Sequence, residues 1–460
     1  MSVRAIVLAA GQGTRMKSDV PKVLHEVAGR PLVSWVLDAV GELDPAEIVV
    51  VIGHEADLVR EALPDGVTVV VQSEQLGTGH AVMVAVEAMG DVSDDTLVVL
   101  PGDMPLIRPG SLGSLLAAHG DAAATLLTAR LDDPTGYGRV VRDGERVVAI
   151  VEERDADERG RAISEVALST YAFDGGRLTE ALRRIGRGNS QGEYYLTDVV
   201  ALLADAGVGA VTAADPADVQ GVNSHDQLAA AAAEMRRRIN LELMQSGVWM
   251  QDPARVYVDA GCVVEAGARL YPGVHLEGST RVAAGATVGP EVFAADSVIG
   301  EGSRVWYAVL RGAEVGSGVE VGPYASLRPG SMLHDRSKVG TFVETKQTIV
   351  GRGSKVPHLS YLGDATIGED SNIGAGTITC NYDGYRKHAT VIGDRVFIGS
   401  DTMLVAPIEV GDEAYTGAGS TVTKDVAPGS LAVERSPQRE VPNYAARRAA
   451  REAGRRADEG

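Results

Sequence analysis

The sequence contains little cysteine and no long run of apolar residues. Among its 460 residues there are two cysteines, Cys262 and Cys380. Two thiols give no disulfide framework, so the composition favours a reducing compartment such as the cytoplasm. No apolar run approaches the length of about 20 residues that a membrane-spanning helix needs. The run over residues 5–10 is also too short for the core of a signal peptide. The sequence therefore predicts a cytoplasmic protein that does not enter a membrane.

Positive charge is also scarce. The formal net charge of −20 argues against nucleic acid or an anionic membrane as the main partner. The tail at residues 447–456 is locally basic, and we interpret it as a solvated or frayed segment. The chain is longer than one hydrophobic core usually supports, so two domains are expected.

What the second half does contain is a six-residue repeat. Aliphatic or small residues recur at every sixth position in three runs: Val264, Leu270, Leu276, Val282 and Val288; Val315, Val321, Leu327, Leu333 and Val339; and Ile392, Ile398, Leu404, Val410, Thr416 and Val422. A period of six fits neither an α-helix nor an ordinary strand. It is typical of a parallel β-helix, in which each short strand places one aliphatic side chain inward before a corner.

The first half alternates short β-branched runs with helical patterns. Strands are predicted at residues 3–8, 47–52, 67–72 and 96–100, and helices at residues 31–43 and 79–89. This alternation predicts a Rossmann-like α/β domain with a mostly parallel sheet. Ligands are then expected at the carboxyl ends of the strands.

A long helix is predicted between the two halves. Residues 227–244 are rich in Ala, Arg and Leu and contain neither Gly nor Pro. We therefore expect a first domain at residues 1–226, a linker helix within 227–250, the β-helix domain at 251–435 and a C-terminal tail at 436–460.

A glycine-containing loop follows the first predicted strand and reads Leu-Ala-Ala-Gly-Gln-Gly-Thr-Arg-Met over residues 8–16. Its glycines let backbone N–H groups approach an anion, and Arg15 adds positive charge. Lys22 supplies a second cation after Pro21. The loop lacks the Gly-Lys-Ser/Thr ending of a P-loop and the third glycine of a dinucleotide-binding loop. By itself it is also compatible with an ordinary strand-to-helix turn.

Several later segments give this loop its context. They are Gln-Ser-Glu-Gln-Leu-Gly-Thr-Gly-His at 72–80, Pro-Gly-Asp at 101–103, Tyr-Gly-Arg at 137–139, Glu152, Gly-Glu-Tyr-Tyr at 192–195 and Gly-Val-Asn at 221–223. Together with the loop they resemble the sugar-1-phosphate nucleotidyltransferases. More closely, they resemble the bacterial bifunctional N-acetylglucosamine-1-phosphate uridyltransferase/glucosamine-1-phosphate acetyltransferase family. The resemblance covers about residues 3–440.

The resemblance implies roles for individual residues of the first half. Uridine and phosphate binding would involve Leu8, Gly11, Gly13, Arg15, Lys22, Gln72, Gly77 and Thr78. The sugar would contact Gly138 and Glu152, and Mg²⁺ would be bound by Asp103 and Asn223. Two protein ligands are few for a metal, but Mg²⁺ usually completes its octahedron with phosphate oxygens and water.

One segment departs from the family pattern. After Glu165 and Val166 the family carries Asn-x-Gly, whereas this chain has Ala167-Leu168-Ser169. Loss of one polar sugar contact would cost about 1–3 kcal/mol of binding free energy. We therefore expect a reduced preference for N-acetylglucosamine 1-phosphate over glucose 1-phosphate.

The repeat of the second half is interrupted by polar segments. Its register is expected to break around residues 351–364 and again at residues 380–388, and insertions in solenoids usually form loops on a functional face. Cations recur along this stretch, which an architectural array does not need. Two or three of them together would bind a phosphate monoester. A lone histidine such as His358 is more often structural than catalytic, but these neighbours favour a functional role.

The same segments resemble the acetyltransferase motifs of the family. By this resemblance His358 is the general base, and glucosamine 1-phosphate is bound by Arg328, Lys346, Tyr361, Asn372 and Lys387. Acetyl-CoA would contact Asn381, Tyr382, Ser400, Ala418 and Arg435. A neutral imidazole suits the removal of a proton from an attacking amine. A thiol mechanism at Cys380 is disfavoured because nothing nearby resembles an activating partner.

The resemblance implies a complete fold and activity. The fold would be an α/β nucleotidyltransferase domain followed by a left-handed parallel β-helix of hexapeptide repeats. The second half would acetylate glucosamine 1-phosphate with acetyl-CoA, and the first would transfer uridylyl from UTP with Mg²⁺. The product, UDP-N-acetylglucosamine, serves peptidoglycan synthesis and cell wall biogenesis. A homotrimer with acetyl sites between neighbouring prisms is implied, with small molecules as substrates.

Two alternatives remain open from the residues. In one, the chain is a uridyltransferase of altered sugar preference whose β-helix serves only as a trimerising scaffold. In the other, it is a nucleotide-sugar sensor that binds without turnover. Substitution of His358 separates the first from our interpretation, and pyrophosphate release from UTP excludes the second.

Overall fold

The computed structural model describes residues 2–53 and 55–458, which form two compact units. Unit 1 contains the residues up to Gln245 together with Val256–Cys262. Unit 2 contains Ser246–Arg255 and the residues from Val263 onward.

The centre of unit 1 is a twisted sheet with strand order β11-β7-β10-β6-β1-β4-β5. Its strands are β1 (Val3–Ala9), β4 (Glu47–Ile52), β5 (Thr68–Val71), β6 (Thr96–Pro101), β7 (Ala124–Arg130), β10 (Glu165–Asp174) and β11 (Val208–Thr212). The four strands predicted from the sequence are β1, β4, β5 and β6. They pair in parallel, as expected for that half of the sheet.

The sheet also has an antiparallel part that the sequence did not indicate. Strand β10 runs antiparallel to both β6 and β7. It also pairs with β8 (Gly138–Asp143), which forms a hairpin with β9 (Arg146–Val151). Between β9 and β10 lies only the four-residue helix α5 (Glu158–Arg161). Strand β8 runs in the same direction as β7, and the β8–β9 hairpin reverses the chain, so β10 enters the sheet opposite to β7.

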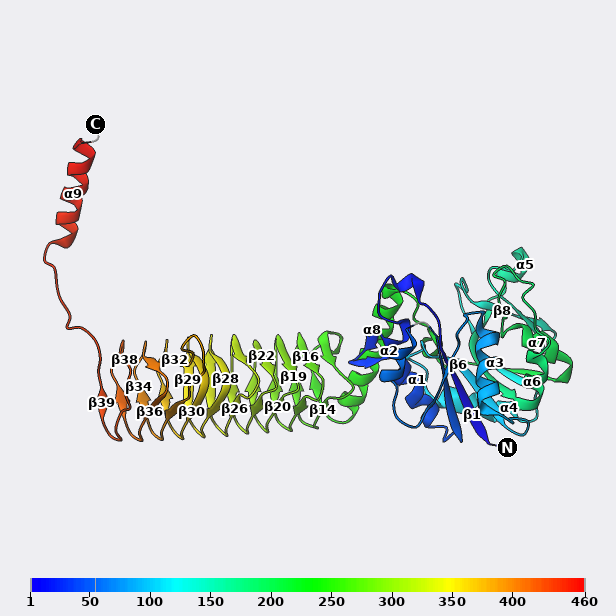
Figure 1. Ribbon diagram of the computed structural model, residues 1–460, viewed down its shortest axis with the longest axis horizontal. Helices are drawn as coiled ribbons and strands as arrows, with labels where there is room; N and C mark the ends of the chain where they lie inside the picture. The colour runs from blue at the N-terminus through cyan, green and yellow to red at the C-terminus, as the bar shows by residue number, and fades with distance from the viewer. Residues whose placement is uncertain (1, 54, 459–460) are drawn as a thin grey trace. The chain divides into compact units, whose positions relative to one another are not determined.

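Helices cover both faces of this sheet, because alternate residues of the central strands point to opposite sides. Ile6 packs with α3 (Thr78–Met89), α6 (Gly175–Leu182) and α7 (Asp198–Leu203) in one core. Its neighbours Ala5 and Val7 pack with α1 (Leu32–Gly41) and α4 (Pro109–His119) in the other. The short helix α2 (Ala56–Glu61) follows β4. Figure 1 shows α1 and α3 flanking β1.

The helix predicted at residues 227–244 is observed as α8 (His225–Gln245). Ala231 and Met235 on this helix are buried against Val27, Leu32 and Leu106. Helix α8 is therefore packed as part of unit 1. No helix in residues 2–53 and 55–458 is long and apolar enough to cross a membrane.

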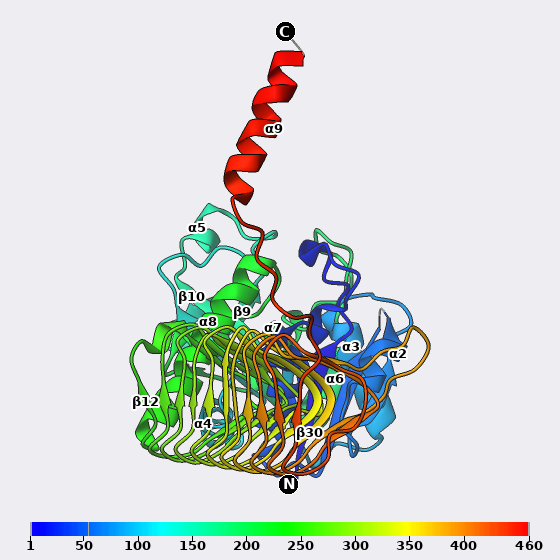
Figure 2. The same cartoon turned by 90° about the vertical axis from the view of Figure 1, so that its left-hand side faces the viewer.

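Unit 2 is a parallel β-helix whose coils stack along one axis, as Figure 1 shows, and lie one behind another in Figure 2. One sheet contains β12 (Trp249–Met250), β15 (Arg269–Leu270), β18 (Thr287–Val288), β21 (Arg304–Val305), β24 (Glu320–Val321), β27 (Lys338–Thr341), β29 (Lys355–His358), β31 (Asn372–Ile373), β34 (Phe397–Ile398), β37 (Tyr415–Thr416) and β39 (Leu431–Ala432). A second sheet bends around the remaining sides and contains β14 (Val263–Val264), β16 (Val274–Glu277), β17 (Arg281–Val282), β19 (Val292–Ala295), β20 (Val298–Ile299), β22 (Ala308–Arg311), β23 (Glu314–Val315), β25 (Ala325–Leu327), β26 (Met332–Leu333), β28 (Glu344–Val350), β30 (Tyr361–Ile367), β32 (Ile378–Cys380), β33 (Thr390–Ile392), β35 (Met403–Val405), β36 (Ile408–Val410) and β38 (Thr421–Val422).

The six-residue pattern is explained by burial. Every residue of the three predicted runs, from Val264 to Val422, is at most 7% exposed. Between runs the buried positions are closer in sequence, as from Ala294 to Ile299 and from Val305 to Leu310. These shorter steps shift the phase of the repeat without interrupting the coil.

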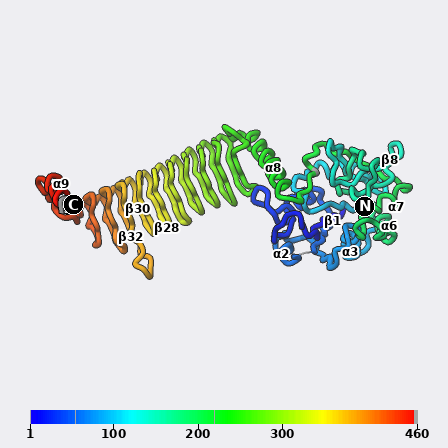
Figure 3. Tube along the Cα trace, turned by 90° about the horizontal axis from the view of Figure 1, so that it is seen from above, coloured from blue at the N-terminus to red at the C-terminus, as the bar shows by residue number. Residues whose placement is uncertain are grey.

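The prediction that the β-helix is interrupted around residues 351–364 is therefore wrong. Strands β28 and β30 pair in continuous parallel register, from Glu344 with Tyr361 to Val350 with Ile367. A shorter step in the repeat caused the apparent break. The second predicted break is real, because residues 381–388 leave the coil between β32 and β33 as a loop, seen beside β32 in Figure 3.

Beyond the last coil, the basic tail contains the helix α9 (Tyr444–Asp458). Its residues Arg447, Arg448 and Arg451 are exposed. This agrees with the prediction of a solvated segment.

Candidate active sites

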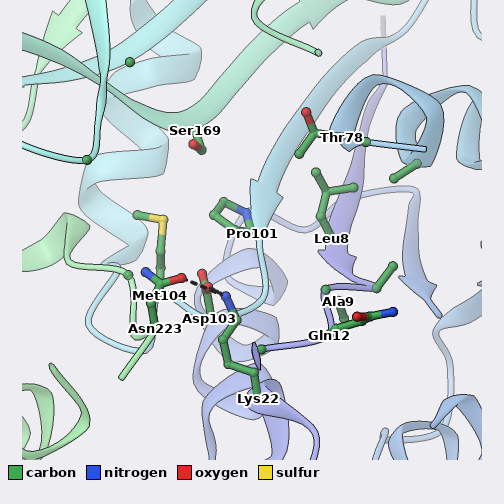
Figure 4. A pocket seen from close by; sticks show the side chains of 18 of the residues that line it. Leu8, Ala9, Gln12, Lys22, Thr78, Pro101, Asp103, Met104, Ser169 and Asn223 are labelled. Atoms are coloured by element: carbon green, nitrogen blue, oxygen red, sulfur yellow. Dashed lines mark hydrogen bonds and ion pairs between the residues drawn. The ribbon is translucent and has the colours of Figure 1, made fainter. Parts of the chain in front are cut away.

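Unit 1 contains a cavity of about 810 Å³ beside the carboxyl ends of β1 and β6. All twelve site residues predicted for the first half line it, although they come from distant parts of the sequence: Leu8, Gly11, Gly13, Arg15, Lys22, Gln72, Gly77, Thr78, Asp103, Gly138, Glu152 and Asn223. Figure 4 shows this cavity from close by. The structure therefore brings the predicted residues together, while their individual roles remain predictions.

The glycine loop after β1 packs tightly against the turn that carries Lys22. Gly13 has a φ of 61°, a left-handed conformation that residues with a Cβ atom rarely adopt. A Cβ atom added to Gly13 would lie 2.7 Å from the Cβ of Lys22. Only glycine therefore allows the loop to approach this lysine so closely.

Two cations and two oxygen-bearing side chains meet at one end of the cavity, where Figure 4 shows Lys22, Asp103 and Asn223. The ammonium of Lys22 forms an ion pair with Asp103 Oδ2 and donates to Asn223 Oδ1 at 3.2 Å. Arg15 Nη2 also donates to Asn223 Oδ1, at 2.8 Å. Oxygens of Asp103 and Asn223 thus converge on a single cationic position. A hard cation such as Mg²⁺ prefers this kind of donor.

The opposite end of the cavity is formed by the loop that begins with Gln72. Gly77 has a φ of 108°, and a Cβ atom there would lie 2.6 Å from the backbone oxygen of Tyr194. Gln72 Nε2 donates to the backbone oxygen of Gly77 at 3.1 Å. Thr78 Oγ1 accepts a hydrogen bond from the Leu196 N–H at 3.1 Å. The loop is therefore held rigidly around an amide side chain.

The predicted sugar end contains a largely buried carboxyl group. Thr197 Oγ1 donates to Glu152 Oε1 at 3.0 Å. Burial raises the pKa of Glu152, and the nearby charges of Asp155 and Asp198 act in the same direction. A Cβ atom on Gly138 would lie 2.8 Å from Ile150 Cγ2, so glycine keeps this wall open.

The segment that departs from the family pattern also lines this cavity. Ala167, Leu168 and Ser169 are all in its wall, at an irregularity in the pairing of β10 with β7. Ser169 has a φ of 52°, a left-handed conformation that glycine adopts without strain. The glycine of the family pattern would therefore suit this backbone better than serine.

Sequence reasoning missed some residues of the cavity wall. Thr197 donates a hydrogen bond to Glu152. Gln75 Nε2 donates to the backbone oxygen of Ala10 at 3.0 Å. The Gln227 side chain accepts from the Asn223 N–H at 2.8 Å. Thr197 and Gln227 lie beside segments that had been singled out, and this proximity was the available signal.

In unit 2, the predicted cations gather on the second sheet near β28 and β30. Arg328 Nη1 donates to Glu344 Oε1 at 2.9 Å, and Lys346 Nζ donates to Asp364 Oδ1 at 3.4 Å. The neighbouring Lys346 ammonium lowers the pKa of Lys387, and the charge of Arg328 lowers this pKa further. Because the cations repel one another, this cluster favours an anionic ligand such as a phosphate monoester.

Asp364 connects this cluster with the loop at residues 381–388. Its Oδ2 accepts a hydrogen bond from Asn381 Nδ2 at 2.5 Å, while its other oxygen accepts from Lys346. A Cβ atom on Gly363 would lie 2.5 Å from both Tyr361 Oη and Asn381 Nδ2. Glycine at this position therefore lets Tyr361 and Asn381 approach each other. Sequence reasoning had not identified Asp364 as part of the site.

The predicted general base lies on the other sheet. His358 is exposed at the end of β29, and Asn372 begins β31. Within residues 2–53 and 55–458, no hydrogen bond or ion pair joins either side chain to the cation cluster. The corner of residues 359–360 separates His358 from Tyr361 at the start of β30.

The residues predicted to contact acetyl-CoA are mostly exposed. Tyr382 is 62% exposed in a loop that Asp383 organises by accepting from the N–H groups of Tyr385 and Arg386. Ser400 and Ala418 occupy the same corner on successive coils, and Arg435 Nη1 donates to the backbone oxygen of Ala418 at 2.7 Å. Burial raises the pKa of the Cys380 thiol, which disfavours a thiolate nucleophile.

An α/β unit with a large cavity lined by Arg15 and Lys22, followed in the chain by a β-helix that carries a cation cluster, is the arrangement of a two-part transferase. The description "MobA-like NTP transferase domain" matches residues 5–170. "Bacterial transferase hexapeptide (six repeats)" matches residues 389–424. The chain thus combines a nucleotidyltransferase with a hexapeptide-repeat transferase.

Similar proteins are called "Bifunctional protein GlmU". The one from Streptomyces coelicolor is 50% identical over 453 residues, covering 96% of this chain and 94% of the relative. The one from Heliobacterium modesticaldum is 49% identical over 449 residues, covering 96% and 98%. That from Pelobacter propionicus is 47% identical over 445 residues, covering 95% and 96%. This chain belongs to the bifunctional GlmU family.

Proposed function

We propose that the protein makes UDP-N-acetylglucosamine in two steps. Unit 2 transfers the acetyl group of acetyl-CoA to the amine of glucosamine 1-phosphate. Unit 1 then joins the product to the uridylyl group of UTP and releases pyrophosphate. The observation that carries the proposal is the gathering of all twelve predicted uridylyltransferase residues around one cavity. The boundaries of the two functional domains would be those predicted from the sequence, with uridylyl transfer in residues 1–226 and acetyl transfer in residues 251–435.

Uridylyl transfer needs positioning and charge neutralisation rather than a side-chain nucleophile. A phosphate oxygen of the sugar phosphate attacks the α-phosphorus of UTP, and the bond to the pyrophosphate oxygen breaks. Arg15 and Lys22 stabilise the negative charge on the phosphates. Gln72, Gly77 and Thr78 hold the uridine, and Glu152 orients the sugar.

The residues at the phosphate end fit Mg²⁺. Asp103 and Asn223 would hold the ion, because their oxygens already converge on the ammonium of Lys22. Within the described residues no group of three His, Cys, Asp or Glu side chains could bind a metal, so the phosphates and water must supply the other ligands. When bound, Mg²⁺ neutralises charge that develops on the phosphate oxygens.

Acetyl transfer is a direct attack of the amine on the thioester carbonyl. His358 accepts the proton that the amine loses, and the thiolate of coenzyme A leaves. Arg328, Lys346 and Lys387 bind the phosphate of glucosamine 1-phosphate, with Tyr361 and Asn372 beside the sugar. Asn381, Tyr382, Ser400, Ala418 and Arg435 contact acetyl-CoA.

A homotrimer is the proposed assembly, with each acetyl site completed by a neighbouring prism. Two observations support a partner on this surface. His358 is exposed, and the rings of Tyr307, Tyr324 and Phe342 form a ladder with centroid spacings of 5.5 and 5.3 Å. These three side chains are 39%, 57% and 57% exposed. Native mass spectrometry should therefore give three times the chain mass of 48.0 kDa.

Incubation with glucosamine 1-phosphate, acetyl-CoA, UTP and Mg²⁺ tests the function. The expected nucleotide sugar is UDP-N-acetylglucosamine, identified by its mass. Omission of acetyl-CoA should stop its formation, and addition of N-acetylglucosamine 1-phosphate should restore it. Formation without acetyl-CoA or an acetylated acceptor would contradict the proposal.

The acceptor preference is a finer part of this proposal. Ala167 and Ser169 in the cavity wall support weaker recognition of the acetamido group. Steady-state kinetics with N-acetylglucosamine 1-phosphate and glucose 1-phosphate measure the preference. A preference for the acetylated sugar as strong as that of a family member carrying Asn-x-Gly would refute the expected change in acceptor preference.

A further inference from the structure

The side chain of Gln72 is locked by two hydrogen-bond acceptors. It is 4% exposed, and its Nε2 lies 3.1 Å from the backbone oxygen of Gly77 and 3.0 Å from Nδ1 of His80. A carbonyl oxygen only accepts, so the amide nitrogen, not the amide oxygen, must face Gly77. This chemistry fixes the orientation of the amide.

The same contacts assign a tautomer to His80. One hydrogen of Nε2 is donated to Gly77, and the second points to the imidazole nitrogen 3.0 Å away. Nδ1 of His80 must therefore be the unprotonated acceptor, with the ring proton on Nε2. If the Gln72 amide turned over, its oxygen would oppose the Gly77 carbonyl, and the ring proton of His80 would have to move from Nε2 to Nδ1. His80 thus adds the cost of this tautomer change to the penalty imposed by Gly77.

Gln72 can then offer a ligand only its amide oxygen, because both amide hydrogens are used. Gln72 and Gly77 line the same cavity. Within residues 2–53 and 55–458, the backbone N–H of Gly77 donates to no other group. The wall therefore presents an acceptor beside a donor. Uracil has the matching edge, with N3–H as donor and O4 as acceptor. Cytosine presents the reverse, a lone pair on N3 beside an amino group.

We propose that His80 is a positioning residue that holds the Gln72 amide oxygen toward the cavity and so sets the preference for uracil over cytosine. The inference rests on the proposed uridylyl transfer and adds His80 to the residues that select the base. His80 acts through Gln72. It also packs against Tyr194, with ring centroids 6.3 Å apart, so a purely structural role is the competing explanation.

Two variants of His80 separate these explanations. His80→Phe keeps the ring and its packing but has no acceptor. His80→Asn loses the ring but places an amide oxygen near the position of Nδ1. The full-length protein is assayed for pyrophosphate release with UTP or CTP as donor. UTP and CTP binding is measured in parallel by calorimetry.

For His80→Phe, the ratio of kcat/KM for UTP over CTP should fall about tenfold, equivalent to about 1.4 kcal/mol. For His80→Asn it should stay within about threefold of the original value, since the acceptor that orients Gln72 is kept. The opposite order, or an equal loss of UTP and CTP activity in both variants, would overturn the inference. Selective UTP binding without turnover in the unsubstituted protein would refute the proposed reaction alone.

Discussion

At the scale of single residues, the sugar end of the uridylyltransferase cavity shows how this chain differs from its family pattern. Ser169 has a φ of 52° beside the buried Ala167. Neither side chain can replace an asparagine amide that reads an acetamido group. The backbone there nevertheless keeps a conformation suited to glycine.

Restoring the family pattern should therefore sharpen sugar selection. The double substitution Ala167→Asn with Ser169→Gly adds one amide contact and relieves the left-handed serine. The kcat/KM ratio for N-acetylglucosamine 1-phosphate over glucose 1-phosphate should rise about tenfold, the value of one good hydrogen bond. Leu168→Met, in the same segment, is the matched control. An unchanged ratio in the double variant would show that this segment does not read the acetamido group.

Glu152 connects function with stability. Burial raises its pKa, so the folded protein binds this proton more tightly than the unfolded chain. The stabilisation from that proton is present at low pH and is lost as the pH rises through the folded-state pKa. Above that pH the buried carboxylate destabilises the fold.

Glu152→Gln should accordingly raise the Tm of unit 1 by about 2–4 °C at pH 8, which corresponds to about 1 kcal/mol. Near pH 4, where the carboxyl is protonated, the difference should disappear. Sugar-phosphate binding should weaken at the same time. Calorimetry at both pH values measures the shift, with the exposed Glu158→Gln as control. Equal Tm values at pH 8 would refute the buried-charge argument.

The sequence predicted the members of this site better than their contacts. The family resemblance identified Lys22, Asp103 and Asn223, which lie far apart in the chain but meet in the structure. The orientation of Gln72 was not predictable, because it depends on two atoms that approach only after β5 and α3 have packed. Asp364 was missed because its contacts with Lys346 on the preceding coil and with Asn381 in the following loop form only when the coils stack.

At the scale of secondary-structure elements, the β-helix follows directly from its inward side chains. A six-residue period predicted the short strands because each coil must bury one aliphatic residue per side. The shorter steps, as from Ala294 to Ile299, could not be told from interruptions, since both shift the phase. The antiparallel direction of β10 was missed because the β8–β9 hairpin, which reverses the chain before β10, was not among the predicted elements.

Inward and outward residues of one strand should differ sharply in their effect on stability. Leu404 in β35 is 0% exposed, whereas its neighbour Val405 is 37% exposed. Leu404→Ala should cost about 2–5 kcal/mol through the cavity that it leaves. Val405→Ala should cost less than about 1 kcal/mol. The stabilities of the two variants are compared by thermal unfolding, with the loss of acetyl transfer as the signal. Equal effects would contradict the assigned register.

The bridge made by Asp364 should matter for acetyl transfer. Asp364→Asn removes the charge that holds Lys346 and an oxygen that accepts from Asn381. We expect kcat/KM for glucosamine 1-phosphate to fall at least about tenfold, the usual value of one charge-assisted hydrogen bond. Uridylyl transfer should be unchanged. Glu369→Gln, which disrupts an exposed ion pair with Arg352 on the same β-helix, is the control. Unchanged acetyl transfer in the Asp364 variant would remove Asp364 from the site.

At the scale of the whole molecule, the residues that one chain contributes to each proposed site lie in a single unit. The uridylyltransferase cavity is lined within unit 1, and the cation cluster lies within unit 2. Sequence alone indicated this division, because the alternation of strands and helices ends where the six-residue repeat begins. The two reactions should therefore be separable by single substitutions.

The most direct test of the account compares His358→Ala and Asp103→Asn in one assay with glucosamine 1-phosphate, acetyl-CoA, UTP and Mg²⁺. His358→Ala should lower acetyl transfer by roughly 10²–10⁴-fold, the usual value of a general base, while added N-acetylglucosamine 1-phosphate restores the nucleotide sugar. Asp103→Asn should accumulate N-acetylglucosamine 1-phosphate and form little UDP-N-acetylglucosamine. Full acetyl transfer by His358→Ala, or loss of both reactions in either variant, would contradict two independent active sites.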